Sequence, residues 1–177
     1  SLHMPSLLLR LSSYDQRLLF ALVHRRRPGL DRFMRAVTHL ADWPVAVSIT
    51  LAMALGAVEG LESTGIRMAW TLGLSHLGVE ILKRVFTRER PRLPVGLEWM
   101  VGVPDRFSFP SGHATAGMAM GLPLVLSLGW PVGVVIAGLA VSIGLSRCYL
   151  GVHYPGDVLA GWALAITTLT GVIALGF

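Results

Sequence analysis

Residues 112–146 read GHATAGMAMGLPLVLSLGWPVGVVIAGLAVSIGLS, a run of 35 residues without a single Asp, Glu, Lys or Arg. A membrane-spanning helix needs only about 20 apolar residues, so this run is too long for one span. The LGWP segment (128–131) near its middle is typical of a tight turn. The run therefore predicts two apolar helices that return the chain to the side of the membrane on which it started.

The composition of the whole chain agrees with a membrane location. Of 177 residues, 53% are hydrophobic and 14% are charged, whereas an ordinary soluble domain has roughly 25% charged residues. The mean hydropathy is +0.63. Five or six spans of about 20 residues use most of the chain, so we expect residues 1–177 to form one domain. The opening SLHM (1–4) resembles a cloning remnant and takes no part in the fold prediction.

Charge and cysteine content restrict the partners. The net charge of +5, on a chain with little water-exposed surface, favours an anionic lipid bilayer or a phosphorylated ligand over nucleic acid. Cys148 is the only cysteine, which excludes a disulfide within the chain and a cluster of thiolate metal ligands. The oligomeric state is not indicated by any of these features.

Three further apolar stretches predict three more spans. Residues 158–177 are free of charge, residues 43–58 are apolar and extend back to about residue 33, and residues 64–85 form a span that contains His76 and Glu80. Residues 12–29 (SSYDQRLLFALVHRRRPG) have a short apolar run and a basic end, which predicts a helix at the membrane interface. The predicted fold class is all-α, a polytopic transmembrane bundle of about five spans plus this N-terminal interfacial helix, with a sixth span there as the alternative.

Each span reverses the side on which the chain lies, and this parity brings polar residues together. The N-terminus, loop 86–110 and segment 147–157 fall on one face, and the turns near residues 60 and 129 and the C-terminus fall on the other. The shared face carries Lys83, Arg84, Arg88, Arg90, Arg92, Arg106, His113, Arg147, His153 and Asp157. Taken one at a time, Arg84, Arg88, Arg92 and Arg106 are better explained as anchors that reach from span ends to the lipid headgroups.

Two short patterns on that face predict an anion site. Lys83 and Arg90 are seven residues apart, about 10 Å along one helical face, and the proline that follows favours a helix end at Arg90. Ser111 is a good N-cap, and the helix after it leaves the backbone N–H groups of Gly112 and His113 free to bind an anion. His113 also adds a group that can transfer a proton near neutral pH. Alone, this second pattern is better explained as a capped helix start with an interfacial histidine.

A third pattern lies at the entry to the last span. His153 and Asp157 are four residues apart in SRCYLGVHYPGD (146–157), and Pro155 suits the first turn of the helix that contains Asp157. A carboxylate on one ring nitrogen fixes the tautomer and leaves the other nitrogen free to attack. Structural His–Asp pairs are common, but two other motifs on the same face favour a nucleophile here.

Together the three patterns resemble the signature of the type-2 phosphatidic acid phosphatases. They read Lys-x6-Arg-Pro (83–91), Pro-Ser-Gly-His (110–113) and Ser-Arg-x5-His-x3-Asp (146–157), and every signature position matches in order. This superfamily includes lipid phosphate phosphatases, undecaprenyl diphosphate phosphatases and glucose-6-phosphatase, and it shares its pocket with the vanadium haloperoxidases. Its helical bundle fits the spans predicted around residues 83–157.

The resemblance implies a hydrolase that uses neither a metal nor another cofactor. In such an enzyme His153 attacks phosphorus to form a phosphohistidine, Asp157 orients its ring, and His113 protonates the leaving group. The implied phosphate-binding residues are Lys83, Arg90, Ser111, Gly112 and Arg147. The implied substrate is a phosphorylated membrane lipid, with undecaprenyl diphosphate, phosphatidic acid and phosphatidylglycerophosphate as candidates.

Two other functions and two orientations stay open. A haloperoxidase would use the same pocket but is expected to be soluble, and a non-catalytic lipid-phosphate binding or transport protein would not require the complete set of catalytic residues. We expect a multi-pass protein of the cell (inner) membrane. The resemblance implies an active site on the extracytoplasmic side, whereas the basic segment HRRRP (24–28) favours the cytoplasmic side.

Four polar residues near the predicted site have no assigned role. His76 and Glu80 share a helical face with Lys83 inside a span, where ionisable residues are functional candidates, but Glu80 is equally explained as the partner of a nearby base. His39 and Asp42 begin the first long span, and an interfacial helix start is favoured for them over a place at the pocket mouth.

Overall fold

The computed structural model describes residues 6–177, so the expectation for residues 1–4 lies outside the described part. Its helices confirm the all-α prediction, and no strand forms within residues 6–177. The helices are α1 (Ser6–Val23), α2 (Pro28–Thr38), the 3-10 turn η1 (His39–Ala41), α3 (Trp43–Ala54), α4 (Glu62–Phe86), α5 (Gly112–Leu128), α6 (Val132–Tyr149) and α7 (Pro155–Ala174).

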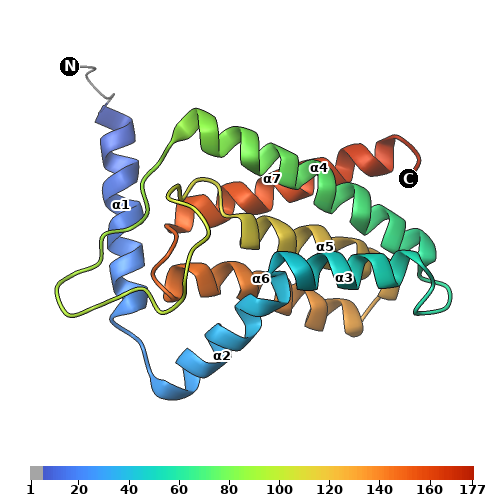
Figure 1. The fold of residues 1–177 in the computed structure, drawn as a ribbon, viewed down its shortest axis with the longest axis horizontal. Helices are drawn as coiled ribbons and strands as arrows, with labels where there is room; N and C mark the ends of the chain where they lie inside the picture. The colour runs from blue at the N-terminus through green and yellow to red at the C-terminus, as the bar shows by residue number, and fades with distance from the viewer. Residues whose placement is uncertain (1–5) are drawn as a thin grey trace.

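The charge-free run at residues 112–146 forms the predicted helix pair. Helix α5 ends at Leu128 and α6 begins at Val132. Gly129 adopts a φ of 61° between them, a left-handed conformation that glycine accepts without a Cβ penalty. The two helices pack against each other over much of their length, as Figure 1 shows.

Helix α1 covers much of the predicted N-terminal interfacial helix, and its place at the interface stays a prediction. It crosses the ends of α6 and α7 instead of lying along them (Figure 1). Leu19 and Val23 on its inner face are buried against Cys148 of α6 and Val158 of α7. The orientation of α1 fits a helix in the plane of the membrane interface.

The first predicted span is broken, which corrects the expectation of one helix from about residue 33 to residue 58. The chain bends by 57° between Pro28–Ala41 and Trp43–Ala54. Asp42 is extended there, with φ −62° and ψ 137°, and Pro44 occupies the first turn of α3, where a proline favours a new helix start. The helix then ends at Ala54, four residues before the predicted end.

The expected five spans are not all evident from helix length and composition. Among the described helices, α6 and α7 are long and apolar enough to cross a membrane, and the bent pair of α2–η1 with α3 makes a third if it is one broken span. Helix α4 carries several charged residues, and α5 has 17 residues. Both nevertheless pack against α7 within the same bundle (Figure 1).

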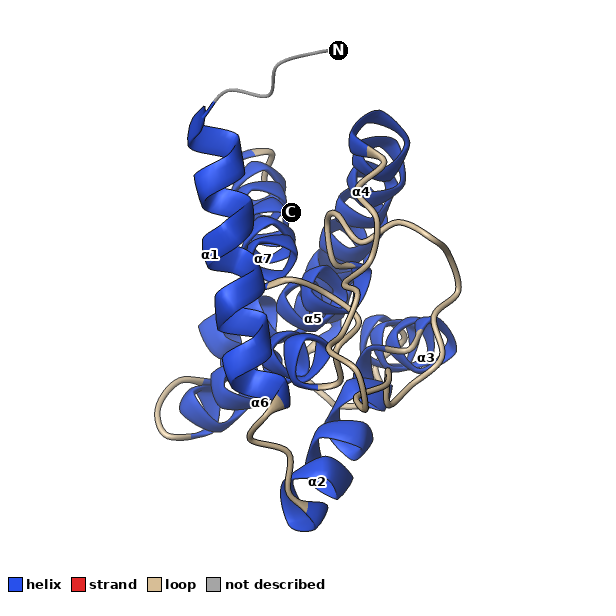
Figure 2. Cartoon of the chain, turned by 90° about the vertical axis from the view of Figure 1, so that its left-hand side faces the viewer, coloured by secondary structure: helices blue, strands red, loops and turns tan. Residues whose placement is uncertain are grey.

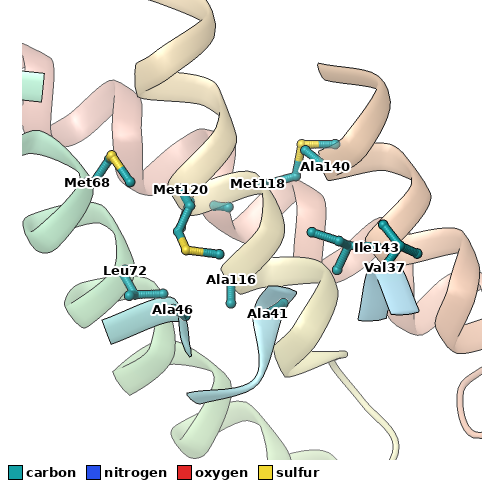
Figure 3. Packing of buried hydrophobic residues seen from close by; sticks show 12 residues of the cluster. Val37, Ala41, Ala46, Met68, Leu72, Ala116, Met118, Met120, Ala140 and Ile143 are labelled. Atoms are coloured by element: carbon teal, nitrogen blue, oxygen red, sulfur yellow. The ribbon is translucent and has the colours of Figure 1, made fainter. Parts of the chain in front are cut away.

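Small side chains allow the helices of this bundle to approach closely, as is common in membranes. In Figure 3, Ala116 and Met120 of α5 lie between Met68 and Leu72 of α4 on one side and α6 on the other. Gly161 of α7 is the tightest point near the polar end, because a Cβ there would lie 2.7 Å from the Ser111 carbonyl oxygen. Glycine at this position therefore sets the distance between α7 and the start of α5.

The predicted parity of the connections is confirmed. Figure 2 looks onto the end of the bundle where loop 87–111, the α6–α7 connection and η1 meet. The α3–α4 and α5–α6 turns and the C-terminus lie at the opposite end (Figure 1). The polar motif residues consequently gather at one end of the molecule.

Candidate active site

A cavity of about 1060 Å³ opens at this polar end. Its walls come from η1, the start of α3, the last turns of α4, loop 100–107, the start of α5 and the end of α6. Six of the eight predicted site residues line it: Lys83, Arg90, Gly112, His113, Arg147 and His153. Ser111 and Asp157 lie behind the wall and are fully buried.

His153 has a defined tautomer. Its Nδ1 lies 2.7 Å from the Ser108 carbonyl oxygen, which only accepts hydrogen bonds, so Nδ1 carries the proton. Its Nε2 lies 3.1 Å from Nη1 of Arg90, which only donates, so Nε2 carries a lone pair. Burial, with help from the charges of Arg147 and Arg90, outweighs Asp157 and lowers the pKa of His153 to about 4. The ring is therefore neutral at physiological pH, with an unprotonated nitrogen at the cavity.

Asp157 supports His153 less directly than its spacing predicts. Its Oδ2 lies 3.6 Å from His153 Nδ1, beyond hydrogen-bond distance, and the Ser108 carbonyl is the closer partner of that nitrogen. Asp157 Oδ2 instead accepts a hydrogen bond from the Tyr154 backbone N–H at 2.9 Å, which closes the first turn of α7. The carboxylate still places a negative charge beside the ring.

Ser108 was not among the site residues predicted from the sequence. It is fully buried, and its hydroxyl donates to the backbone carbonyls of Arg88 and Glu89 at 3.3 and 3.1 Å. Its backbone N–H donates to the Arg88 carbonyl at 2.8 Å. These bonds fix the Ser108 carbonyl where it meets His153. No local pattern marks the residue, because the contact depends on the path of the whole loop.

Arg88 is not an interfacial anchor, which corrects the interpretation based on its place after α4. Its Nη1 donates to Asp157 Oδ1 and its Nη2 donates to Asp15 Oδ2, both at 2.7 Å. Asp15 belongs to α1 and also accepts from the Gly156 backbone N–H at 2.7 Å. Burial alone would lower the pKa of Arg88, but the two carboxylates outweigh it and raise the pKa. Arg88 thus links α1 to the carboxylate beside His153.

The other three arginines assigned as anchors are exposed, and their contact with lipid headgroups stays a prediction. Arg92 is 89% exposed and pairs with Glu89 at the surface. Arg106 is exposed and lies 5.1 Å from the centre of the Phe107 ring. Arg84 is also exposed but contributes to the cavity wall.

Arg147 has a hydrogen-bond donor without a partner. The side chain is 2% exposed, and its Nη1 donates to Thr38 Oγ1 at 2.8 Å. Its Nε is buried and makes no hydrogen bond within residues 6–177. A buried guanidinium N–H that lacks an acceptor is costly, and the residue lines the cavity, so an anion bound there would satisfy it.

Asp105 occupies the position expected for an anion. Its Oδ2 lies 2.7 Å from Lys83 Nζ and its Oδ1 lies 3.1 Å from Arg90 Nη2. Burial would raise the pKa of Asp105, but Lys83 and Arg90 together lower it, so the carboxylate is ionised. The two predicted cations of the phosphate site therefore converge on one carboxylate. Asp105 was missed because nothing in the sequence shows that loop 87–111 folds back over Lys83.

The start of α5 is built as predicted. Ser111 Oγ accepts a hydrogen bond from the Ala114 N–H at 3.4 Å, as an N-cap does. Since Ser111 lies behind the wall, its direct contact with phosphate remains a prediction. Gly112 lines the cavity, and an added Cβ would meet only Val79, at 3.9 Å. Packing therefore does not require a glycine there, whereas close approach of a ligand to the backbone would.

Asp42 holds His113, which corrects the interpretation of His39 and Asp42 as a simple helix start. Asp42 Oδ1 lies 2.9 Å from His113 Nε2, and its Oδ2 lies 2.7 Å from His39 Nδ1. Asp42 makes no side-chain cap to α3. The bend before α3 brings this carboxylate across to α5, where it orients the predicted proton donor.

The cavity is also lined by Arg35 of α2 and by His76 and Glu80 of α4. The last two share one helix face. Neither contacts the residues described above through a hydrogen bond, as far as residues 6–177 show. In the same part of the chain, no group of three or more His, Cys, Asp or Glu side chains is arranged to hold a metal ion.

Comparison with known proteins shows similarity to one superfamily of phosphatases. A model of the PAP2 superfamily matches residues 64–177. The chain is 37% identical to decaprenylphosphoryl-5-phosphoribose phosphatase of Mycolicibacterium smegmatis over 140 residues, 76% of this chain and 73% of that protein. It is 36% identical to undecaprenyl-diphosphatase of Sulfolobus acidocaldarius over 104 residues, 56% of this chain and 49% of that protein.

A solved structure is also similar. The PAP2 type phosphatidylglycerolphosphate phosphatase of Bacillus subtilis superposes with a TM-score of 0.75 at 28% sequence identity. The match covers 94% of this chain and 86% of that protein.

Proposed function

The chain belongs to the PAP2 superfamily, and from this premise we propose that it is an integral membrane phosphatase that hydrolyses the terminal phosphate of a phosphorylated lipid. The relatives described above are all phosphatases, and those three act on lipid-linked or lipid phosphates by name. A soluble haloperoxidase fits the apolar bundle less well. We further propose that residues 1–177 act as one phosphatase domain.

The observation that carries the mechanism is the tautomer of His153. Its Nε2 carries a lone pair at the cavity, and its Nδ1 proton is held by the Ser108 carbonyl. In the proposed first step, Arg90 Nη1 transfers its hydrogen bond from Nε2 to a phosphate oxygen, which frees the Nε2 lone pair. A bond then forms between Nε2 and phosphorus while the bond from phosphorus to the leaving oxygen breaks. His113 gives its proton to that oxygen. The resulting imidazolium is stabilised by the negative charge of Asp157.

The second step removes phosphate from His153. Water attacks phosphorus, the bond between phosphorus and Nε2 breaks, and His113 takes back a proton from the water. Inorganic phosphate then leaves the cavity. The step restores the starting protonation of both histidines, so the cycle balances without a metal or a further cofactor.

The cations around the cavity stabilise the charge on phosphorus during both steps. Arg147 offers an N–H that has no partner, and Gly112 offers a backbone N–H at the start of α5. Arg90 and Lys83 offer the cationic groups that now pair with Asp105. Phosphoryl transfer depends mainly on such positioned donors. In the proposed cycle Asp105 moves away when the phosphate of a substrate binds, because the phosphate takes the place of its carboxylate beside Lys83 and Arg90.

Phosphate release from lipid phosphates tests the proposed activity. The purified protein is assayed in detergent micelles with EDTA present, using phosphatidic acid, phosphatidylglycerophosphate and undecaprenyl diphosphate. We expect phosphate release from at least one of them and none from a His153→Ala variant. Absence of release from every lipid phosphate, or equal release by the variant, would contradict the proposal.

A further inference from the structure

The cavity extends well beyond the proposed phosphate site. Lys83, Glu80 and His76 lie on one face of α4 and all line the cavity. With a rise of about 1.5 Å per residue, Glu80 is roughly 4.5 Å and His76 roughly 10 Å from Lys83 along the helix axis. The same cavity therefore offers a leaving group, on a substrate whose phosphate lies between Lys83 and His153, a wall that contains Glu80 and His76.

Glu80 forms no direct ion pair with a neighbouring base in the described part of the chain. No Lys, Arg or His of residues 6–177 lies within 4 Å of its carboxylate, and Lys83, three residues on, pairs with Asp105 instead. Glu80 also accepts no hydrogen bond in that part of the chain. A half-buried carboxylate on a helix of a membrane bundle is costly unless it has a partner. The carboxylate therefore has free acceptor capacity that faces the cavity.

His76 adds a second polar group to the same wall. The Trp43 ring packs against its imidazole with 4.5 Å between ring centres, which fixes the plane of the ring. The imidazole nitrogens make no hydrogen bond with the described residues. The proposed phosphoryl transfer uses neither Glu80 nor His76, so their place beside the leaving group needs another explanation.

We infer that Glu80 and His76 bind hydroxyl groups of the leaving alcohol, so that the preferred substrate is a lipid carrying a phosphorylated polyol. This inference rests on the proposed function. A carboxylate without a partner accepts from a hydroxyl donor, and imidazole bonds a hydroxyl in either direction. A diacylglycerol leaving group offers no hydroxyl. The leaving group of a diphosphate is itself anionic, and Glu80 repels it.

A matched pair of substrates measures the contribution of the leaving-group hydroxyl to kcat/KM. Phosphatidylglycerophosphate is compared with its analogue that has 1,3-propanediol in place of the phosphorylated glycerol and so lacks the free hydroxyl. We expect kcat/KM to favour the hydroxylated lipid on the order of 10- to 100-fold, the range of a hydrogen bond to a charged group. Phosphatidic acid and undecaprenyl diphosphate are measured under the same conditions.

Variants of Glu80 test whether this residue causes the preference for the hydroxylated lipid. In Glu80→Ala the ratio of the two kcat/KM values should fall toward one. In Glu80→Gln part of the ratio should remain, because the amide oxygen still accepts, and the diphosphate should improve relative to phosphatidic acid. Glu59→Ala is the control, since Glu59 is an exposed glutamate at the opposite end of the bundle.

The ratio is measured within one preparation of each variant, so it does not depend on the fraction of protein that folds. An unchanged ratio in Glu80→Ala, or no preference in the wild type, would overturn the inference while the phosphatase activity stands. Absence of hydrolysis of all four lipids by the wild type would instead overturn the proposed function.

Discussion

At the residue scale, we propose that Asp105 competes with phosphate for two cations. It neutralises Lys83 and Arg90 in the same place where the proposed substrate binds. If the carboxylate is exchanged for phosphate on binding, the affinity for phosphate is lower and its release is easier than without Asp105. The sequence motifs identify the two cations but not this carboxylate, because it lies outside the motifs and approaches them only through the folding of loop 87–111.

The substitution Asp105→Asn tests this competition. Asparagine keeps an oxygen that can accept from the Phe107 N–H, which Asp105 Oδ1 now accepts at 3.0 Å, but it removes the negative charge. We expect inorganic phosphate and vanadate to inhibit the variant on the order of tenfold more strongly, since hydrogen bonds to charged groups contribute about 1.5–3 kcal/mol. The measurement compares the inhibition constants of phosphate and vanadate for the variant and the wild type. Unchanged or weaker inhibition would show that Asp105 does not compete with phosphate.

His153 provides a second prediction at this scale, a titration far below the usual histidine range. The unfolded chain takes up a proton near pH 6.5, whereas folded His153 does so only near its pKa of about 4. Acidification between these values therefore favours unfolding, and the nucleophile stays neutral throughout this range. NMR of histidine-labelled protein, assigned with a His153→Gln variant, should show no titration of this ring above pH 5. A midpoint near 6.5 would contradict its buried environment.

At the element scale, α1 is joined to the catalytic residues through Arg88. The guanidinium bridges Asp15 of α1 and Asp157 of α7 with two separate nitrogens. The interface helix was predictable from its short apolar run and basic end. The bridge was not, because an arginine two residues after a span has the same sequence context whether it faces lipid headgroups or a buried carboxylate.

The substitution Arg88→Lys distinguishes a surface anchor from a residue that bridges two buried carboxylates. Lysine keeps the charge but cannot hold two carboxylates in the planar fork of arginine. We expect kcat to fall on the order of tenfold, equivalent to about 1.4 kcal/mol, with a smaller change in KM, because Arg88 positions Asp157 and does not touch phosphate. Arg92→Lys, the same change at an exposed site four residues on, is the control. Equal kinetics of the two variants would return Arg88 to the class of surface anchors.

The break between η1 and α3 also belongs to the element scale. Hydropathy alone favours one continuous span, and Pro44, which lies in the first turn of α3, took no part in that prediction. The bend has a function in the site, because it directs Asp42 toward His113. A local pattern could suggest the break but not the residue that Asp42 would meet, since that residue is 71 positions away.

At the scale of the whole molecule, parity and three motifs were enough to predict which end carries the site. Lys83, Arg90 and Arg147 line one cavity with both histidines because each connection reverses the chain direction. The network around that site was beyond prediction, because Ser108, Asp15 and Asp105 act through contacts that depend on loop paths. Neither the motifs nor the contact network indicates which side of the membrane the site faces.

We propose that the site faces the extracytoplasmic side, and the single native cysteine makes this testable. Cys148 is buried, so an introduced thiol can be labelled selectively. Arg106 is exposed beside the cavity, and Glu59 is exposed at the opposite end. A membrane-impermeant maleimide should label Arg106→Cys in intact cells, and Glu59→Cys only after permeabilisation. The reverse pattern would place the site on the cytoplasmic side, as the basic N-terminal segment suggests.

The central claim is that His153 carries the phosphoryl group, and the most direct measurement is to trap that group on the protein. Wild type, His153→Ala, His113→Ala and the exposed control His24→Ala are mixed with a radiolabelled activated phosphate ester, quenched rapidly in alkaline detergent and analysed for bound label. The account predicts an acid-labile, base-stable phosphoenzyme in wild type, His24→Ala and His113→Ala, because an activated leaving group needs little protonation. It predicts none in His153→Ala, and label in that variant would contradict the account.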